Sequence, residues 1–121
     1  MRLMSLLLVA GLPLAECRVI DDPVVCTDIF VYGINVTLTD ADTGAPIAGA
    51  TLTLTEGTYS EILEAFPGSG QYVGAGERAG TYTLTADADG YESKTVTNIV
   101  IGADECHVIP VVLTIELTPA E

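Results

Sequence analysis

The chain has 121 residues, enough for one domain with a hydrophobic core once a short leader is set aside. Its 17 acidic and 4 basic side chains give a formal net charge of −13 at pH 7, which argues against nucleic acid or an anionic lipid surface as a partner. A protein partner of unknown identity is the expectation that remains, and the composition does not fix the oligomeric state.

Residues 1–16 have the layout of a secretory signal peptide. Arg2 supplies a positive charge, an apolar stretch of about a dozen residues follows, and Pro13 comes before small residues. The stretch is too short to span a bilayer as a mature helix. The sequence therefore predicts an exported protein, with a polar tether over residues 17–27 and a folded domain over residues 28–118.

Cys17 ends the stretch Leu14-Ala15-Glu16-Cys17, which resembles the bacterial lipobox. The resemblance implies lipidation of Cys17 and a membrane-anchored protein of the cell envelope. Glu16 departs from the motif, which has a small residue at that position. Simple secretion therefore stays open as the alternative, as does a different start codon, because the signal is short for its class.

Three cysteines, Cys17, Cys26 and Cys106, leave one unpaired in an exported chain. If Cys17 carries lipid, Cys26 and Cys106 form the only possible disulfide. In the chain-entropy model, closing a loop of about 80 residues stabilises a fold by about 4–5 kcal/mol. The alternative is that Cys26 and Cys106 are two separate buried thiols.

The first half of the domain reads as strands separated by turns. A period of two predicts a strand over residues 30–39, with Phe30, Tyr32, Ile34, Val36 and Leu38 on one face. The Asp- and Gly-rich residues 40–46 form a turn, and residues 48–54 alternate as a second strand. Residues 59–66 have some helical propensity, but the segment is too short for a stable helix, so we expect a strand.

The second half continues the same pattern. We expect a short strand over residues 71–74, a glycine-rich loop at Gly74, Gly76 and Gly80, and a strand over residues 81–86. After a turn at residues 87–90, a strand runs from about Tyr91 to Ile101 with a bulge near Thr97 and Asn98. The last strand places Ile109, Val111, Leu113, Ile115 and Leu117 on one face, and Pro110 indicates an edge position or the strand's first residues.

Seven or so short strands with frequent turns and no amphipathic helix predict an all-β protein with two packed sheets. Two stretches are more specific. Residues 36–52 contain the turn Gly44-Ala45-Pro46-Ile47 between two strands, and residues 80–91 read Gly-Thr-Tyr-Thr-Leu-Thr-Ala followed by Gly90-Tyr91. Together they resemble a carboxypeptidase regulatory-like domain over about residues 30–117. The resemblance implies a transthyretin-like, seven-stranded Greek-key β-sandwich of the Ig-like kind, without catalytic activity.

The inventory of side chains supports a protein that is not an enzyme. General acid–base catalysis near neutral pH most often uses histidine, and His107 is the single histidine. Ser60, Ser69 and Ser93 lack the Gly-x-Ser-x-Gly context of a hydrolase nucleophile. No cofactor is expected, and zinc is disfavoured because the cysteines are better used in a disulfide.

A small-ligand binder is the alternative to a structural or interaction module. Asp40 with Asp42, and Asp87 with Asp89, resemble the opening of a calcium loop, although further oxygen ligands are missing. These four carboxylates are the candidate metal ligands, and their case strengthens if both turns lie at one end of the sandwich. Tyr59, Tyr72 and Tyr91 are the candidate platforms for carbohydrate.

Overall fold

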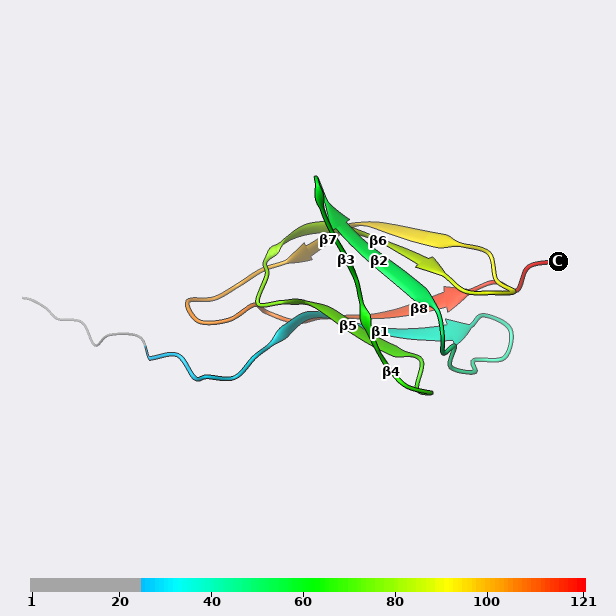
Figure 1. The fold of residues 1–121 in the computed structure, drawn as a ribbon, viewed down its shortest axis with the longest axis horizontal. Coiled ribbons are helices and arrows are strands. Elements are labelled where there is room, and N and C mark those ends of the chain that lie inside the picture. The colour runs from blue at the N-terminus through cyan, green and yellow to red at the C-terminus, as the bar shows by residue number, and fades with distance from the viewer. Residues whose placement is uncertain (1–24) are drawn as a thin grey trace, which may run out of the picture.

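The computed structural model describes residues 25–121, and these residues form a sandwich of two four-stranded sheets (Figure 1). The predicted signal peptide, Cys17 and the tether up to residue 24 lie outside the described residues. One sheet has the order β4-β5-β1-β8 and the other β3-β2-β6-β7. Their strands are β1 (Tyr32–Asp40), β2 (Thr51–Glu56), β3 (Tyr59–Ile62), β4 (Glu64–Phe66), β5 (Gln71–Gly76), β6 (Gly80–Asp87), β7 (Lys94–Ile101) and β8 (Val111–Leu117).

The core follows from period-two alternation, because successive side chains of a strand point to opposite faces of its sheet. In β1 the side chains of Ile34, Val36 and Leu38 are buried, and Asn35 and Thr37 between them are partly exposed. Leu52 and Leu54 of β2 are buried in the facing sheet. The all-β, two-sheet prediction is confirmed. No helix in residues 25–121 has the length and apolar character needed to cross a membrane.

The predicted edge position of the last strand is also correct. β8 is the outermost strand of its sheet and pairs in parallel with β1, from Ile34 opposite Val111 to Asp40 opposite Leu117. Pro110 directly precedes β8, where its missing N–H costs no ladder hydrogen bond. Ile109 does not join the core face as expected, because it lies before the strand and is exposed.

The segment 59–66 is not the single strand that we expected. It forms β3 in one sheet and β4 in the other, with Leu63 between them. The Leu63 side chain is buried, and its N–H donates to the carbonyl of Leu52 over 2.9 Å. The chain crosses from sheet to sheet at this residue, which makes eight strands rather than seven.

The expected glycine-rich loop is wrong in position. Gly74 and Gly76 lie within β5, and Gly80 begins β6. Side chains from elsewhere fill the space beside the two strand glycines, since a Cβ at Gly74 would overlap Leu63 and a Cβ at Gly76 would overlap the ring of Phe30. The glycines therefore serve close approach rather than a turn.

Three other boundaries differ from the predictions. β1 starts at Tyr32, and Phe30 is exposed rather than on the core face. β2 starts at Thr51 rather than at residue 48, because Gly49 has a positive φ of 77°, which is incompatible with an extended strand at that residue. β7 starts at Lys94 rather than at residue 91.

The bulge predicted near Thr97 and Asn98 is confirmed. Tyr82 pairs with Ile99 and Leu84 with Val96, so two residues of β7 lie opposite one residue of β6. Asn98 adopts a φ of 58°, a conformation that asparagine tolerates better than most residues. The bulge interrupts β7, which is an edge strand, and it makes that edge a poorer template for pairing.

Candidate functional site: the N-terminal clasp

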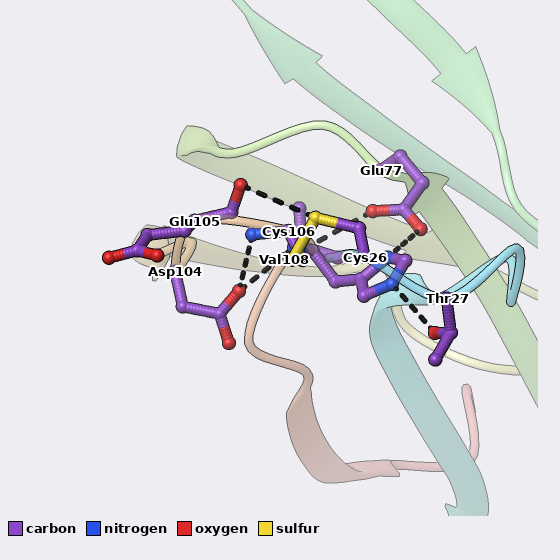
Figure 2. The surroundings of a disulfide bond; sticks show 8 residues. Cys26, Thr27, Glu77, Asp104, Glu105, Cys106 and Val108 are labelled. Atoms are coloured by element: carbon purple, nitrogen blue, oxygen red, sulfur yellow. Dashed lines mark hydrogen bonds and ion pairs between the residues drawn. A yellow bond between two sulfur atoms is a disulfide. The ribbon is translucent and has the colours of Figure 1, made fainter. Parts of the chain in front are cut away.

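A disulfide joins Cys26, which precedes β1, to Cys106 in the β7–β8 loop (Figure 2). The two Cα atoms are 5.2 Å apart and the residues are separated by 80 positions. This is the pairing that the cysteine count indicated. The bond fixes the N-terminal segment against the loop that leads into β8. It thus joins the two segments that lead into the parallel strands β1 and β8, at one end of this pair.

Asp104 shapes the loop that carries Cys106. The backbone N–H groups of Cys106 and His107 both donate to Asp104 Oδ1 over 2.9 Å, and the N–H of Asp104 donates to the carbonyl of His107. The hydrogen bonds from the N–H groups of His107 and Cys106 lower the pKa of the Asp104 carboxyl. The loop is thus a side-chain-capped turn that presents Cys106 and His107 side by side.

Glu77 connects three segments at this end of the sandwich. Its Oε2 accepts from the N–H of Val31 over 3.0 Å, and its Oε1 accepts from the N–H of Val108 over 3.3 Å. Its own N–H donates to the carbonyl of Val31 over 2.9 Å. One carboxylate therefore joins the N-terminal segment, the β5–β6 loop and the β7–β8 loop.

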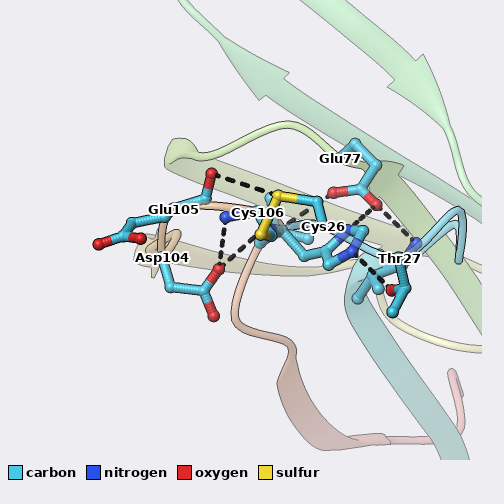
Figure 3. Close-up of polar contacts among 9 residues, drawn as sticks. Cys26, Thr27, Glu77, Asp104, Glu105 and Cys106 are labelled. Atoms are coloured by element: carbon cyan, nitrogen blue, oxygen red, sulfur yellow. Dashed lines mark hydrogen bonds and ion pairs between the residues drawn. A yellow bond between two sulfur atoms is a disulfide. The ribbon is translucent and has the colours of Figure 1, made fainter. Parts of the chain in front are cut away.

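The hydrogen bonds of His107 place its ring between Glu77 and Thr27, both labelled in Figure 3. Its Nδ1 is 2.6 Å from Glu77 Oε2, and its Nε2 is 3.2 Å from Thr27 Oγ1. Opposite an ionised carboxylate, Nδ1 carries the proton, so in the neutral ring Nε2 accepts from the Thr27 hydroxyl. We call Cys26, Thr27, Glu77, Asp104, Cys106 and His107 the N-terminal clasp.

The charge of Glu77 is stabilised by its partners. Partial burial by itself would raise the pKa of this carboxyl, but the hydrogen bonds from His107 and from the N–H groups of Val31 and Val108 outweigh it and lower the pKa. Glu77 also has a positive φ of 50°, which is unusual for a residue with a side chain. The surrounding contacts hold this backbone conformation in place.

Arg78, the next residue, fixes the loop that carries Glu77. Its guanidinium lies 3.6 Å from the centroid of the Tyr59 ring, and its Nη1 donates to Glu56 Oε1 over 2.8 Å and to the Tyr82 hydroxyl over 2.7 Å. The Tyr59 hydroxyl donates to Glu61 Oε1, and this hydrogen bond with partial burial raises the pKa of Tyr59 to about 12. The cluster anchors the loop by stacking and by charge.

The order carboxylate, imidazole, hydroxyl in Glu77, His107 and Thr27 is also the order found in hydrolases that use a nucleophilic hydroxyl. Such a site needs in addition N–H donors for the oxyanion and a cavity for the substrate. Here the neighbouring N–H groups of Cys106 and His107 are occupied by Asp104. In the structure, these three side chains connect the N-terminal segment, the β5–β6 loop and the β7–β8 loop.

The two acidic turns lie together at the opposite end of the sandwich, which we call the acidic end (residues 40–50 and 87–93). Asp40 Oδ1 accepts from the N–H groups of Asp42 and Thr43, and Asp40 Oδ2 accepts from the Tyr91 hydroxyl over 2.7 Å. The Tyr91 hydroxyl, followed by the two N–H groups, lowers the pKa of the Asp40 carboxyl. Both oxygens of Asp40 are therefore engaged within the protein.

A shallow cavity of about 280 Å³ lies beside these turns, lined in part by Asp87, Asp89 and Tyr91. The Ser93 hydroxyl donates to Asp87 Oδ1 over 2.5 Å. Residues 25–121 nowhere bring three or more His, Cys, Asp or Glu side chains into one group that could hold a metal ion. Asp40, Asp42, Asp87 and Asp89 share an end of the molecule but do not assemble into a coordination shell there.

The three candidate tyrosines are engaged in packing. Tyr72 is buried, and its hydroxyl donates to the carbonyl of Ile47 over 2.7 Å. Tyr59 lies beneath Arg78, and Tyr91 is partly buried with its hydroxyl on Asp40. Burial removes Tyr72 as a platform for sugar, Arg78 covers one face of Tyr59, and Tyr91 lines the cavity beside the acidic turns.

Sequence reasoning identified Cys26 and Cys106, used His107 only as an argument against catalysis, and missed Thr27, Glu77 and Asp104. The spacing Asp104-x-Cys106 is a local signal for a side-chain-capped turn and could have been found. No local signal marks Glu77, because its partners lie 30 and 46 positions away.

Comparison with known proteins gives one result that covers most of the chain. A protein-family model described as the carboxypeptidase regulatory-like domain matches residues 33–118. The match spans β1 to β8 and includes Glu77, Asp104, Cys106 and His107. Cys26 and Thr27 lie before its start. No curated protein matches the chain.

Proposed function

Since the chain belongs to the carboxypeptidase regulatory-like domain family, whose members are non-catalytic Ig-like modules, we propose that it is an exported module of the bacterial cell envelope. Its role in this proposal is structural or in protein interaction, with Cys17 as a lipid anchor. We expect the partner to be a protein rather than a nucleic acid, because a formal net charge of −13 repels phosphate backbones.

The Cys26–Cys106 disulfide is the observation that carries the proposal. Disulfides form and persist in oxidising compartments and are rare in the cytosol. The leader over residues 1–16 provides an independent argument for export, since it has the charge, the apolar stretch and the small residues of a signal peptide. Neither feature depends on the family.

Intact mass of the native protein, taken from membrane and secreted fractions with and without reduction, tests the proposal. A lipid-anchored protein starts at Cys17, carries the mass of acyl groups and gains two hydrogens on reduction. A secreted protein of unmodified mass would replace the anchor with simple secretion. An intact leader and free thiols in the cytosolic fraction would overturn export altogether.

A further inference from the structure

The end of the sandwich that carries the N-terminal clasp also carries exposed apolar side chains. Val25 is 85% exposed, Ile29 63%, Phe30 61% and Ile109 54%. They account for four of the eight large hydrophobic side chains that are exposed among residues 25–121. We call these four residues the tether-end patch.

The clasp holds the patch together. The Cys26–Cys106 bond and the Thr27–His107 contact place the segment before β1 beside the loop before β8, and both lie at the same end of the molecule (Figure 1). The Phe30 ring lies over Gly76 and meets the Tyr32 ring edge-on, with centroids 5.1 Å apart. The clasp therefore holds the segment that carries Ile29 and Phe30 near the loop that carries Ile109.

The anchor of the proposed function would lie close to this surface. Cys17 and Val25 are eight positions apart in the sequence, and a chain of that length reaches at most about 29 Å when fully extended. A lipid on Cys17 would thus confine the tether-end patch to the neighbourhood of the bilayer, where its effective concentration is high. The acidic end would point away from the membrane.

We propose that the tether-end patch rests in the interface of the bilayer that anchors the protein, so that the module stands on the membrane in one orientation. This inference depends on the lipid anchor of the proposed function. Aromatic and aliphatic side chains gain free energy at the boundary between headgroups and acyl chains. Asp28, Asp104 and Glu105 border the patch, so the lipid surface is zwitterionic, because anionic headgroups repel these carboxylates.

The composition of the chain allows a direct test. The chain contains no tryptophan and only two phenylalanines, Phe30 in the patch and Phe66 on β4, which is 47% exposed. Phe30→Trp and Phe66→Trp are therefore matched single reporters. In the oxidised chain from residue 17 onward, Cys17 is the only free thiol, and a diacyl lipid can be coupled to it chemically.

Both reporters are anchored to phosphatidylcholine vesicles whose acyl chains are brominated. We expect at least about twofold quenching of the tryptophan at position 30 and little at position 66, because an interfacial side chain enters about 5–10 Å into the headgroup and acyl boundary. Adding Ile29→Ser and Ile109→Ser to the Phe30→Trp chain should weaken the quenching. Ile62→Ser on β3 is the control and should leave it unchanged.

Equal quenching at both positions, or none at position 30, would overturn the inference. An emission shift at position 30 that grows with protein concentration without lipid would also overturn it, since a second copy would then cover the patch. Quenching that strengthens on phosphatidylglycerol would contradict the zwitterionic surface. The coupled lipid supplies the anchor chemically. A negative quenching result therefore concerns the patch alone and is distinct from finding that Cys17 is not lipidated in the native protein.

Discussion

The two ends of the sandwich are closed in different ways. At the N-terminal clasp, a disulfide and the Glu77 carboxylate connect segments that are 30 to 80 positions apart. At the acidic end, Asp40 caps its own turn, and main-chain hydrogen bonds join Leu117, Thr118 and Ala120 to the two turns. The acidic end thus combines local turn chemistry with hydrogen bonds between distant segments, whereas the clasp adds a covalent bond between such segments.

This difference predicts where each end is vulnerable. A covalent bond between distant segments also restricts the unfolded chain, so the loss of the Cys26–Cys106 disulfide should affect the whole domain. A turn residue contributes mostly through its backbone conformation and its close packing. The stability lost when it is replaced therefore depends on the space around that residue.

Replacing Cys26 with serine should be the most damaging change. Opening a loop of 80 residues removes about 4 kcal/mol of stability in the chain-entropy model, which corresponds to a fall in Tm of about 15 °C or more for a domain of this size. Thermal unfolding measures it, with Cys26→Ser/Cys106→Ser as the control for a stray thiol. An unchanged Tm in both variants would show that the clasp is held without its covalent bond.

At the acidic end, Gly70→Ala should cost more than Gly44→Ala. Both glycines have a positive φ, 72° and 77°. A Cβ at Gly70 would approach Pro46 Cβ to 2.7 Å, whereas one at Gly44 meets nothing within 4 Å. We expect about 1 kcal/mol for Gly44→Ala and about 3 kcal/mol for Gly70→Ala by urea unfolding. Equal losses would mean that backbone conformation alone matters at this end.

Tyr72→Phe removes a buried hydroxyl that the turn at residues 46–50 needs. This hydroxyl donates to the carbonyl of Ile47 over 2.7 Å and accepts from the N–H of Ala50 over 3.2 Å. Leaving both groups without a partner should cost about 1–2 kcal/mol. Tyr82→Phe is the matched change near the clasp, and it should cost less because water can reach its partner Arg78. The reverse order in urea unfolding would contradict this view of the two ends.

Glu77→Gln should change how stability depends on pH. The pKa of Glu77 is lowered in the folded protein from its ordinary value of 4.5. Its contribution is therefore complete above about pH 4.5, and it is lost as the pH falls through the lower folded value. The variant should be less stable near neutral pH. In urea unfolding, its free energy of unfolding should also fall less steeply as the pH is lowered, and we call this fall the acid limb.

Glu105→Gln, in the neighbouring loop, is the control for Glu77→Gln and should keep the acid limb of the original protein. If Glu77→Gln retains that limb too, the acid sensitivity of the domain arises elsewhere, and the first group to examine is Asp40, whose pKa is also lowered.

Asp40→Asn should have the smallest effect. The amide oxygen can still accept from the N–H groups of Asp42 and Thr43, and the main loss is the charged acceptor of the Tyr91 hydroxyl. We expect a slight decrease in Tm, matched by Tyr91→Phe. A decrease as large as that of Cys26→Ser would remove the distinction between the two ends.

Much of the fold could be predicted from residues close in sequence. Alternation in Val36 and Leu38 placed β1, Pro110 indicated the edge at β8, and the change of parity between Val96 and Ile99 located the bulge. The crossing between the sheets at Leu63 could not be predicted in this way. A buried leucine is as compatible with one continuous strand as with a crossing, and only the positions of both sheets decide that the chain crosses there.

The candidate site divides in the same way. Counting cysteines predicted the pairing of Cys26 with Cys106 on the expectation that Cys17 carries lipid, because three cysteines allow few pairings. A carboxylate has many possible partners, so the sequence could not assign Glu77 to His107, Val31 and Val108.

Local periodicity and a small number of reactive groups were thus enough to predict the alternating strands, most of the turns and, with Cys17 set aside for lipid, the disulfide. The tertiary structure alone decided which glycines serve close approach, where the chain changes sheets and how Glu77 joins three segments. These features depend on distances between residues far apart in the chain, and such distances exist only once the two sheets have packed.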